Sequence, residues 1–364
     1  MNYEIDFIGI MEHTKDASAV CLRWYSEELS RYIVVVYDGG FKIHGEALVD
    51  ILNKYYFTGE SNPTIDIVIC SHSDDDHAEG LAGLFDHFKV AHLIMNRPWL
   101  FSDELFPYVD DGRKTKSSVE KKLKEKYSSI VTLEEKAISA GTQIHHGFTT
   151  LDFNGAFSPL KILSPTEELY LQLIVESTKT PYVAKSVSEL AVKKVIVAVR
   201  KIVEKWTSDT LRDDISTTAE NETSIVLMGD MVSEKFLLTG DAGVRALSVA
   251  ADYADSIGID LKIVTVHQIP HHGSRHNVSP KILNRIVGSI VSKDIKPTKT
   301  AFVSVGKDSD HPKGMVTNAY IRRGVKVFEA RTCTIHHHKG DMPEREGWIS
   351  ATSNNFSFEV DDWD

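Results

Sequence analysis

An unbroken apolar run, residues 65–70, is followed at once by a loop that holds two histidines and three aspartates. The run reads Ile-Asp-Ile-Val-Ile-Cys and is rich in β-branched residues, which favour strands. Because it shows almost no polar alternation, we expect a strand that is buried on both faces. The loop, residues 71–77, reads Ser-His-Ser-Asp-Asp-Asp-His. This junction predicts a buried sheet that carries chemistry at a strand end.

Further strand-type and helix-type segments follow along the chain. Runs of β-branched and aromatic residues predict strands over residues 5–10, 19–24, 32–37, 224–228, 235–238, 261–266, 300–305 and 325–328. Apolar residues at three- and four-residue spacing predict helices over residues 78–88, 244–257, 280–291 and 315–323. This mixture predicts an α/β (α+β) fold in which helices cover sheets.

We expect a single domain over residues 1–364, with two helical insertions. Residues 102–130 are charge-rich, and residues 166–220 are expected to be mainly helical. Within the second insertion, apolar residues from Val192 to Trp206 form a stripe, and basic residues lie largely off it. Such a stripe is typical of a helix packed on the core. The alternative is a helix that docks a protein partner, or a basic ridge that faces phosphates.

The composition bounds the class of protein. Hydrophobic content is 42% and charged content is 26%, as in ordinary soluble proteins. No apolar run reaches the ~18 residues that a membrane span needs. Three distant cysteines and the lack of an evident signal peptide favour a reducing cytoplasm. The acidic end, residues 359–364, is expected to lack order.

The net charge of −11 argues against broad, non-specific adhesion to nucleic acid, because phosphate binding needs a basic face. Bound divalent cations would offset several of the acids, so the charge does not exclude a nucleic-acid substrate.

Ligand-type residues stand at the ends of three predicted strands. They are His72, Asp74, Asp76 and His77 in the first loop, Asp241 in the second, and His271 and His272 in the third. One such loop is usually a solvated polar turn. Three of them at strand ends indicate a metal site, because sheet proteins place chemistry there.

The spacing of these residues predicts two ions. In an extended loop, residues two apart project to the same side, so His72 and Asp74 can converge on one ion. Asp76 and His77 are adjacent and project apart, so they suit a second ion. Asp241 is then the bridging carboxylate, since one acid can hold two cations about 3.5–4 Å apart.

These motifs resemble those of the metallo-β-lactamase superfamily, whose first motif is His-x-His-x-Asp-His. The closer similarity is to the branch that contains the hydrolase domain of the DNA-uptake channel protein ComEC. The matching segments are residues 38–40, 71–77, 221–224, 239–241, 270–274, 304–306 and 310–312. The resemblance covers roughly residues 1–335. It implies an αββα sandwich with the metals at one edge, between the two sheets.

Two departures bear on the metal. Asp74 stands where the superfamily has a second histidine, and Asn221 where another histidine is usual. The resemblance therefore implies fewer nitrogen ligands, with Asn221, Asp38 and Ser274 as additional candidates at the site. Oxygen-rich sites favour manganese or magnesium, and nitrogen sites favour zinc. We expect two divalent metal ions, Mn²⁺ or Zn²⁺. DNA uptake itself is not implied.

The expected activity is metal-dependent hydrolysis by an activated water, with a phosphodiester of nucleic acid as the first candidate substrate. Asp76 would hold the second metal and orient the water. His272 and His311 would donate to the leaving oxygen or grip the phosphate. Two alternatives stay open. One is a hydrolase of cyclic nucleotides or lactone-type esters. The other is a partner-binding subunit of a multi-protein system, for example in defence, that docks through residues 166–220.

Overall fold

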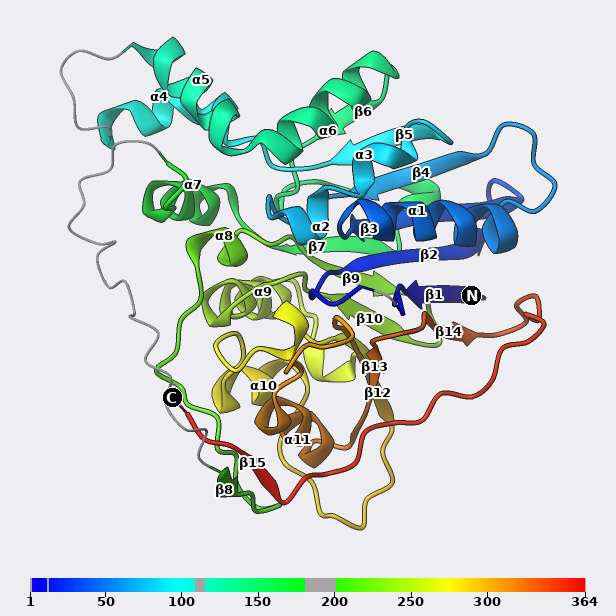
Figure 1. Ribbon diagram of the computed structural model, residues 1–364, viewed down its shortest axis with the longest axis vertical. Helices are drawn as coiled ribbons and strands as arrows, with labels where there is room; N and C mark the ends of the chain where they lie inside the picture. Colours follow the sequence, from blue (N-terminus) through cyan, green and yellow to red (C-terminus); the bar gives the residue numbers. More distant parts are fainter. Residues whose placement is uncertain (1, 12, 109–114, 181–200, 364) are drawn as a thin grey trace.

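Two β-sheets packed face to face, with helices on both outer sides, make up the computed structural model, which describes residues 2–11, 13–108, 115–180 and 201–363 (Figure 1). The first sheet has the order β14-β1-β2-β3-β4-β5-β6. Its strands are β1 (Tyr3–Phe7), β2 (Ala19–Ser26), β3 (Arg31–Gly39), β4 (Thr64–Ile69), β5 (Lys89–Ile94), β6 (Gln143–His145) and β14 (Ile335–Lys339). The predicted αββα sandwich is confirmed.

The second sheet has the order β13-β12-β11-β10-β9-β7. Its strands are β7 (Leu160–Ser164), β9 (Val226–Asp230), β10 (Lys235–Leu238), β11 (Val266–Gln268), β12 (Lys299–Ser304) and β13 (Val325–Ala330). β3 and β4 run parallel in the first sheet, as β10 and β11 do in the second. Parallel neighbours end at the same edge of a sheet, so the loops that follow these strands can converge.

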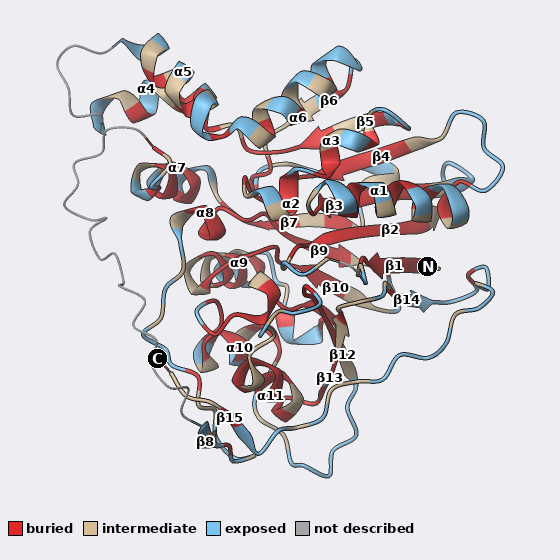
Figure 2. Cartoon of the chain, viewed as in Figure 1, coloured by how far each residue is buried: buried red, intermediate tan, exposed pale blue. Residues whose placement is uncertain are grey.

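The alternation of side chains along the strands explains why both faces of the first sheet are buried (Figure 2). In β1, Tyr3, Ile5 and Phe7 belong to the core between the two sheets. Glu4 and Asp6, which project to the other side, are fully buried too. The two remaining cores lie between each sheet and its helices.

Helices on the first sheet are α1 (Lys42–Ile51), α2 (Asp75–Ala78), α3 (Leu81–Leu84), α5 (Lys116–Lys126) and α6 (Ser128–Ser139), and α1 continues as a π-helical turn (Leu52–Tyr56). Helices on the second sheet are α9 (Val244–Ser256), α10 (Pro280–Ile286) and α11 (Gly314–Arg322). Three further helices are α4 (Ser102–Leu105), α7 (Glu167–Glu176) and α8 (Ala219–Glu222).

Several predicted elements have other bounds. The helix expected over residues 78–88 is interrupted between α2 and α3, because Gly80 lies against the loop after β3. A Cβ on Gly80 would lie 2.0 Å from the carbonyl oxygen of Gly39. The strand expected over residues 261–266 is wrong. Leu261–Ile263 form a 3-10 turn, and β11 starts only at Val266.

The expected insertions are helical only in part. In residues 102–130, α4 and α5 are present, and residues 109–114 lie outside the described residues. The apolar stripe after Val192 falls mainly on residues 181–200, which also lie outside them. Its end is not helical, because Lys201–Val203 form strand β8.

The acidic end of the chain is ordered as far as residue 363, which corrects the expectation of disorder. Glu359–Asp361 form β15, which pairs antiparallel with β8. Val360 provides the physical reason, because its side chain is 3% exposed and belongs to the core of the second sheet. Burying an aliphatic side chain in this way stabilises the folded state by about 1.5–3 kcal/mol.

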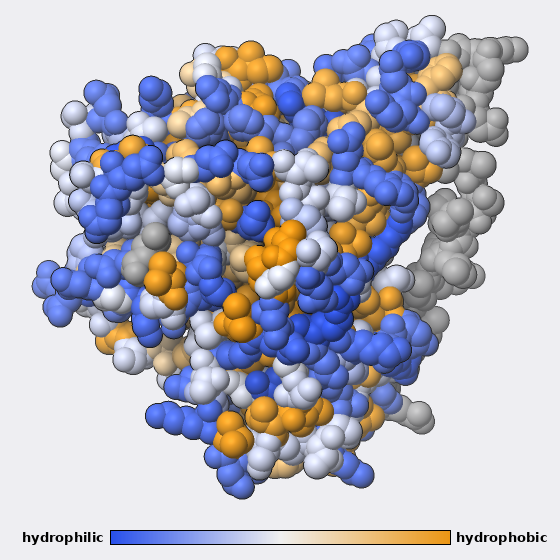
Figure 3. All heavy atoms as spheres, turned by 180° about the vertical axis from the view of Figure 1, so that it is seen from behind, coloured by the Kyte–Doolittle hydropathy of each residue, from blue (hydrophilic) through white to orange (hydrophobic). Residues whose placement is uncertain are grey.

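None of the helices in the described part of the chain is both long and apolar enough to cross a bilayer. On the face opposite to that of Figure 1, apolar residues lie in patches separated by hydrophilic side chains (Figure 3). Cys21 and Cys70 are buried, Cys333 is exposed, and all three are free thiols.

Candidate metal centre

Four strand ends deliver polar side chains to one edge of the sandwich. β3 ends at Asp38 and Gly39, and β4 leads into residues 71–77. In the second sheet, β10 leads to Asp241 and β11 leads to His271 and His272. We call seven of these residues the edge cluster: His72, Asp74, Asp76, His77, Asp241, His271 and His272.

One side of the edge cluster gathers around Oδ1 of Asp241. This oxygen lies 3.0 Å from Nε2 of His77. Oδ2 of Asp76 lies 3.7 Å from the same nitrogen and 3.2 Å from Nε2 of His272. One ligand atom from each of these four residues lies within 4.8 Å of the others. A single cation could therefore contact two imidazoles and two carboxylates here.

The other side gathers around Oδ2 of the same aspartate. It lies 3.6 Å from Nε2 of His271 and 4.0 Å from Nε2 of His72. Oδ2 of Asp74 lies 3.7 Å from Nε2 of His72. Asp241 thus turns one oxygen toward each group, as a bridging carboxylate would.

The outer ring nitrogens of the four histidines are all held by oxygen atoms. His77 Nδ1 lies 2.7 Å from Oδ2 of Asp38. The remaining partners of Nδ1 are Ser71 Oγ for His72, Asn277 Oδ1 for His271 and the Ser304 carbonyl for His272. A proton on Nδ1 leaves the lone pair on Nε2, which is the arrangement of histidines that bind metals.

Three inner atoms of the edge cluster lack hydrogen-bond partners. Nε2 of His72, Nε2 of His77 and Oδ1 of Asp241 are buried and form no hydrogen bond within the described chain. Leaving a buried polar atom unpaired costs about 1–3 kcal/mol. Divalent cations in the two groups would satisfy all three atoms, so the residues present fit a metal site of mixed nitrogen and oxygen donors.

The electrostatic interactions within the edge cluster also fit a metal site. Burial alone disfavours imidazolium, but the carboxylates of Asp241, Asp38 and Asp76 raise the pKa of His77 well above its usual value. Against the same burial, Asp241 and Asp76 raise the pKa of His272 to about 9. Burial also opposes ionisation of Asp241, but His77, His271 and His272 hold its pKa well below the usual range. Without a metal, protons on histidine balance the acids.

The backbone of two of the strand-end loops is strained. His271 and His272 have φ angles of 46° and 55°, and Asp38 has a φ of 60°. Such conformations cost about 1–3 kcal/mol each for residues other than glycine and cluster at functional sites. They persist here because contacts fix them. The N–H of His271 donates to the carbonyl of Gly240, and Asp38 accepts from the N–H of Ser71.

Other sequence candidates lie around the edge cluster. Asp38 lies behind His77, and Asn221 contacts Nδ1 of His271 at 3.2 Å, on the outer side of that ring. His311 Nδ1 lies 2.9 Å from Oδ2 of Asp16. Ser274 is buried, and its hydroxyl accepts from the N–H two residues further on, within its own loop.

Three contacts were not predicted from the sequence. Asn277 holds His271, Ser304 holds His272 through a carbonyl, and Asp16 holds His311. An asparagine six residues after His271, or an aspartate before the strand at 19–24, is a weak signal by itself. A backbone carbonyl leaves no sequence signal at all.

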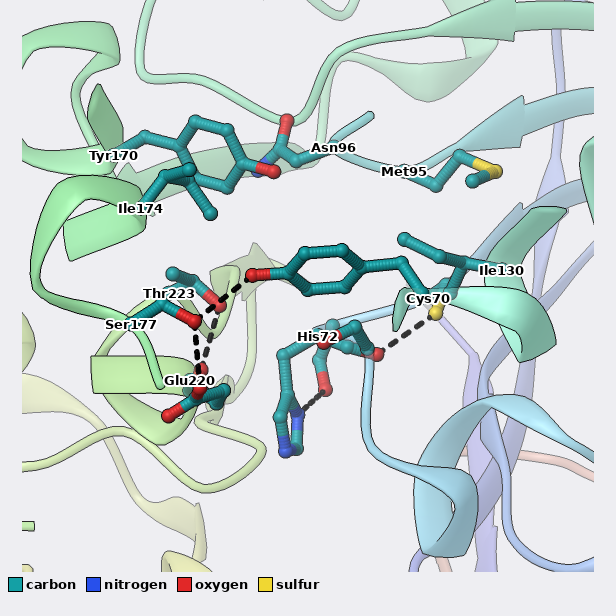
Figure 4. A pocket seen from close by; sticks show the side chains of 13 residues that line it. Cys70, His72, Met95, Asn96, Ile130, Tyr170, Ile174, Ser177, Glu220 and Thr223 are labelled. Carbon is teal, nitrogen blue, oxygen red and sulfur yellow. Dashed lines mark hydrogen bonds between the residues drawn. The ribbon is translucent and has the colours of Figure 1, made fainter. Parts of the chain in front are cut away.

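A small cavity lies on the far side of the first loop (Figure 4). Its volume of about 10 Å³ is the space of roughly one water molecule. Tyr127 and Glu220 both approach Ser177 there, at 3.0 Å and 2.6 Å between oxygen atoms. Nδ2 of Asn96 is buried and unpaired. The cavity is too small for a substrate group and suits a structural water.

Comparisons with known proteins give a family match for part of the chain and structural neighbours of low sequence identity. Residues 33–151 match the family model described as the metallo-beta-lactamase superfamily. Comparison with curated proteins gives no match. Among solved structures, Zn(2+)-bound PqqB from Methylobacterium extorquens is 11% identical, covers 91% of this chain and 99% of its own, and has a TM-score of 0.39.

A metallo-beta-lactamase assigned in Thermotoga maritima is 12% identical and covers 71% of this chain and 94% of its own, with a TM-score of 0.31. The family match covers residues 33–151, and the αββα sandwich is consistent with the metallo-beta-lactamase fold.

Proposed function

We propose that this protein is a metal-dependent hydrolase that holds two divalent cations and cleaves phosphodiesters, with nucleic acid as the substrate class. The observation that carries the proposal is Asp241, whose two oxygens face two separate groups of histidine and carboxylate. A pair of cations bound there would activate water and hold both the attacking and the leaving oxygen of a phosphodiester.

The first cation would contact His72, Asp74, His271 and Asp241, and the second would contact Asp76, His77, His272 and Asp241. This assignment moves His272 from proton donor to metal ligand, because its Nε2 faces Asp76 inside the second group. Each position then offers two nitrogens and two carboxylates, so zinc fits as well as manganese.

The side chains of the edge cluster differ in exposure, and this favours one direction of approach. The side chains of His72 and His77 are fully buried, whereas those of Asp74, Asp76 and His271 are 32%, 25% and 30% exposed. A substrate would reach the cations past these three residues. Asp76 would hold the second cation and orient the water, and His77 and His272 lower the pKa of its carboxyl despite its burial, which keeps it ionised.

His311 remains the proton donor in this proposal. Its Nδ1 is held by Asp16, which fixes the ring and leaves Nε2 to protonate the leaving oxygen. Asp16 is itself fixed by the N–H of Gly306 and the hydroxyl of Ser309. This chain of contacts resembles the carboxylate–imidazole pairs that orient general acids.

The test is turnover with defined metals. The purified protein is incubated with Mn²⁺, Mg²⁺ or Zn²⁺ and with single- and double-stranded DNA, RNA and bis-p-nitrophenyl phosphate, beside an Asp241→Asn variant. Phosphodiester turnover that is lost in the variant supports the proposal. Turnover of a lactone or a thioester with no phosphodiester cleavage under any metal would refute it and favour a small-molecule ester hydrolase.

A further inference from the structure

The start of α1 lies beside the edge cluster and carries no capping group. Residues 39 and 40 are glycines, Phe41 is the N-cap, and its side chain forms no capping hydrogen bond. No acidic residue occupies the first turn. The N–H groups of Lys42 and Ile43 accordingly have no acceptor within the described chain. A helix start after a glycine turn, with free N–H groups, is a common binding site for phosphate.

His44, in the same first turn, provides an independent observation. The residue is only 4% exposed, yet its Nδ1 is buried without a hydrogen-bond partner. Burial, followed by the charges of His13 and His272, lowers the pKa of His44 to about 3. The ring is therefore neutral at pH 7 and has one N–H to donate. A buried polar atom without a hydrogen-bond partner is unfavourable and points to a ligand.

The loop between β1 and β2 brings positive charge over this helix start. The ring of His13 lies 4.8 Å from the ring of His44 and 5.2 Å from that of Phe41, between centroids. Nζ of Lys15 lies 5.8 Å from the centroid of Phe41. The carbonyl of His13 accepts from the N–H of Lys307, whose side chain is exposed. We call His13, Lys15, His44 and the start of α1 the helix-start group.

The same loop joins the helix-start group to the edge cluster. The N–H of Ser18 donates to the carbonyl of Asp76 at 3.0 Å. His272, Asp76 and His77 all act electrostatically on His44. Among the described residues of this loop the one carboxylate, that of Asp16, already accepts from His311, Ser309 and Gly306. It is therefore compensated and would not repel an anion strongly.

We propose that the helix-start group binds a phosphate group of the substrate next to the phosphodiester that is cleaved. The proposal rests on the proposed phosphodiesterase activity and extends it. The substrate would carry at least two phosphates, as a nucleic-acid strand does. A local basic site at the helix start would also explain how an acidic protein, with a net charge of −11, recognises a polyanion.

The first test measures phosphate binding without metal. The full chain is treated with EDTA, and inorganic phosphate binding is followed by equilibrium dialysis. Lys15→Glu is expected to weaken binding by about five- to tenfold, because it reverses a charge at a helix start. Lys121→Glu on α5, where the lysine is also exposed, changes the net charge equally and is expected to leave binding unchanged.

His44→Phe keeps the ring and removes both nitrogens, and it is expected to weaken phosphate binding by about tenfold. Circular dichroism shows whether this buried variant folds, and Lys15→Glu keeps the test decisive if it does not. Equal weakening by Lys15→Glu and Lys121→Glu, or no phosphate binding by the unaltered chain, would overturn the proposal.

The second test separates phosphate binding by the helix-start group from the hydrolytic activity itself. With metal present, Lys15→Glu is expected to raise KM for a 5′-phosphorylated dinucleotide and to leave KM for bis-p-nitrophenyl phosphate, which has one phosphate, unchanged. An equal rise for both substrates would overturn the proposal. The chain could also bind phosphate through Lys15 and show no phosphodiester turnover. That result would refute the proposed function and still support an anion site at the helix start.

Discussion

Two groups of buried acids and histidines in this protein are balanced in different ways. On β1, Glu4 and Asp6 are fully buried and face arginine. Arg345 lies 2.9 Å from Glu4 and 2.8 Å from Asp6, and Arg23 lies 2.6 Å from Glu4. His336 lies 3.1 Å from Asp6. We call this group the arginine-paired cluster.

The edge cluster buries similar acids without such partners. Among the described residues, its closest lysine or arginine contact is at the rim, where Nζ of Lys179 lies 2.7 Å from Asp74. Arginine cannot lose its proton, so the arginine-paired cluster is permanently balanced. Imidazoles can exchange a proton for a metal ion. The difference separates a structural charge network from a group of side chains that could hold an exchangeable cation.

The largest expected effect tests the arginine-paired cluster. Arg345→Ala leaves Glu4 and Asp6 without their shared cation and is expected to lower the free energy of unfolding by about 3–5 kcal/mol. Metal binding by the folded fraction should not change. Urea denaturation and metal titration measure the two quantities. A loss of metal affinity without a loss of stability would remove the distinction between the clusters.

The pH dependence of stability tests the balance in the edge cluster. The pKa of His272 in the folded protein is raised to about 9. Protonated His272 therefore stabilises the folded state below about pH 6.5, and this stabilisation is lost as the pH rises toward 9. The metal-free protein should lose stability on the order of 3 kcal/mol over this window. The metal-loaded protein should lose less, because its histidines are already deprotonated. Identical pH profiles with and without metal would contradict a metal at His272.

Removing the bridging carboxylate tests the edge cluster directly. Asp241→Asn keeps the shape of the side chain and removes its charge. Metal affinity is expected to fall by about 100-fold or more. Loss of a residue that only hydrogen-bonds to a metal ligand costs about 10–100-fold in affinity, and loss of a direct ligand should cost at least as much. Isothermal titration measures this affinity, and Asp38→Asn, which alters only the partner of His77, should have a smaller effect. Equal effects of the two variants would argue against a bridging role.

The smallest effect concerns the rim. Lys179→Ala removes a partly exposed ion pair and should change stability by no more than about 1 kcal/mol. Because the ammonium competes for Asp74, metal affinity should rise by a few-fold. A fall in metal affinity, measured in the same titration, would instead make Lys179 part of the support of the site.

Much of the fold followed from local patterns in the sequence. The apolar run at residues 65–70 gave β4 to within a residue at each end, and the runs at 19–24 and 32–37 gave β2 and β3. The helix after the first loop was misjudged, because its interruption depends on Gly80 packing against Gly39 across the fold. The terminal strand β15 was missed because its partner, β8, is distant in the chain.

The candidate site divides along the same line. Ligand-type residues at strand ends were visible in the sequence, as was the separation of His72 and Asp74 from Asp76 and His77. The direction in which His272 points was not visible in the sequence, because it depends on a left-handed backbone turn and on the carbonyl of Ser304. His44 gave no signal, since its burial and its lack of a partner exist only in the packed structure.

By itself, the sequence determined the alternation of buried strands and covering helices and the presence of seven metal-type side chains in three loops, because these depend on residue type and spacing. The tertiary structure alone decided which oxygen of Asp241 faces which group, and which buried atoms stay unpaired. It also decided that a basic loop covers the start of α1. Such features depend on distances between atoms far apart in the chain, which only folding fixes.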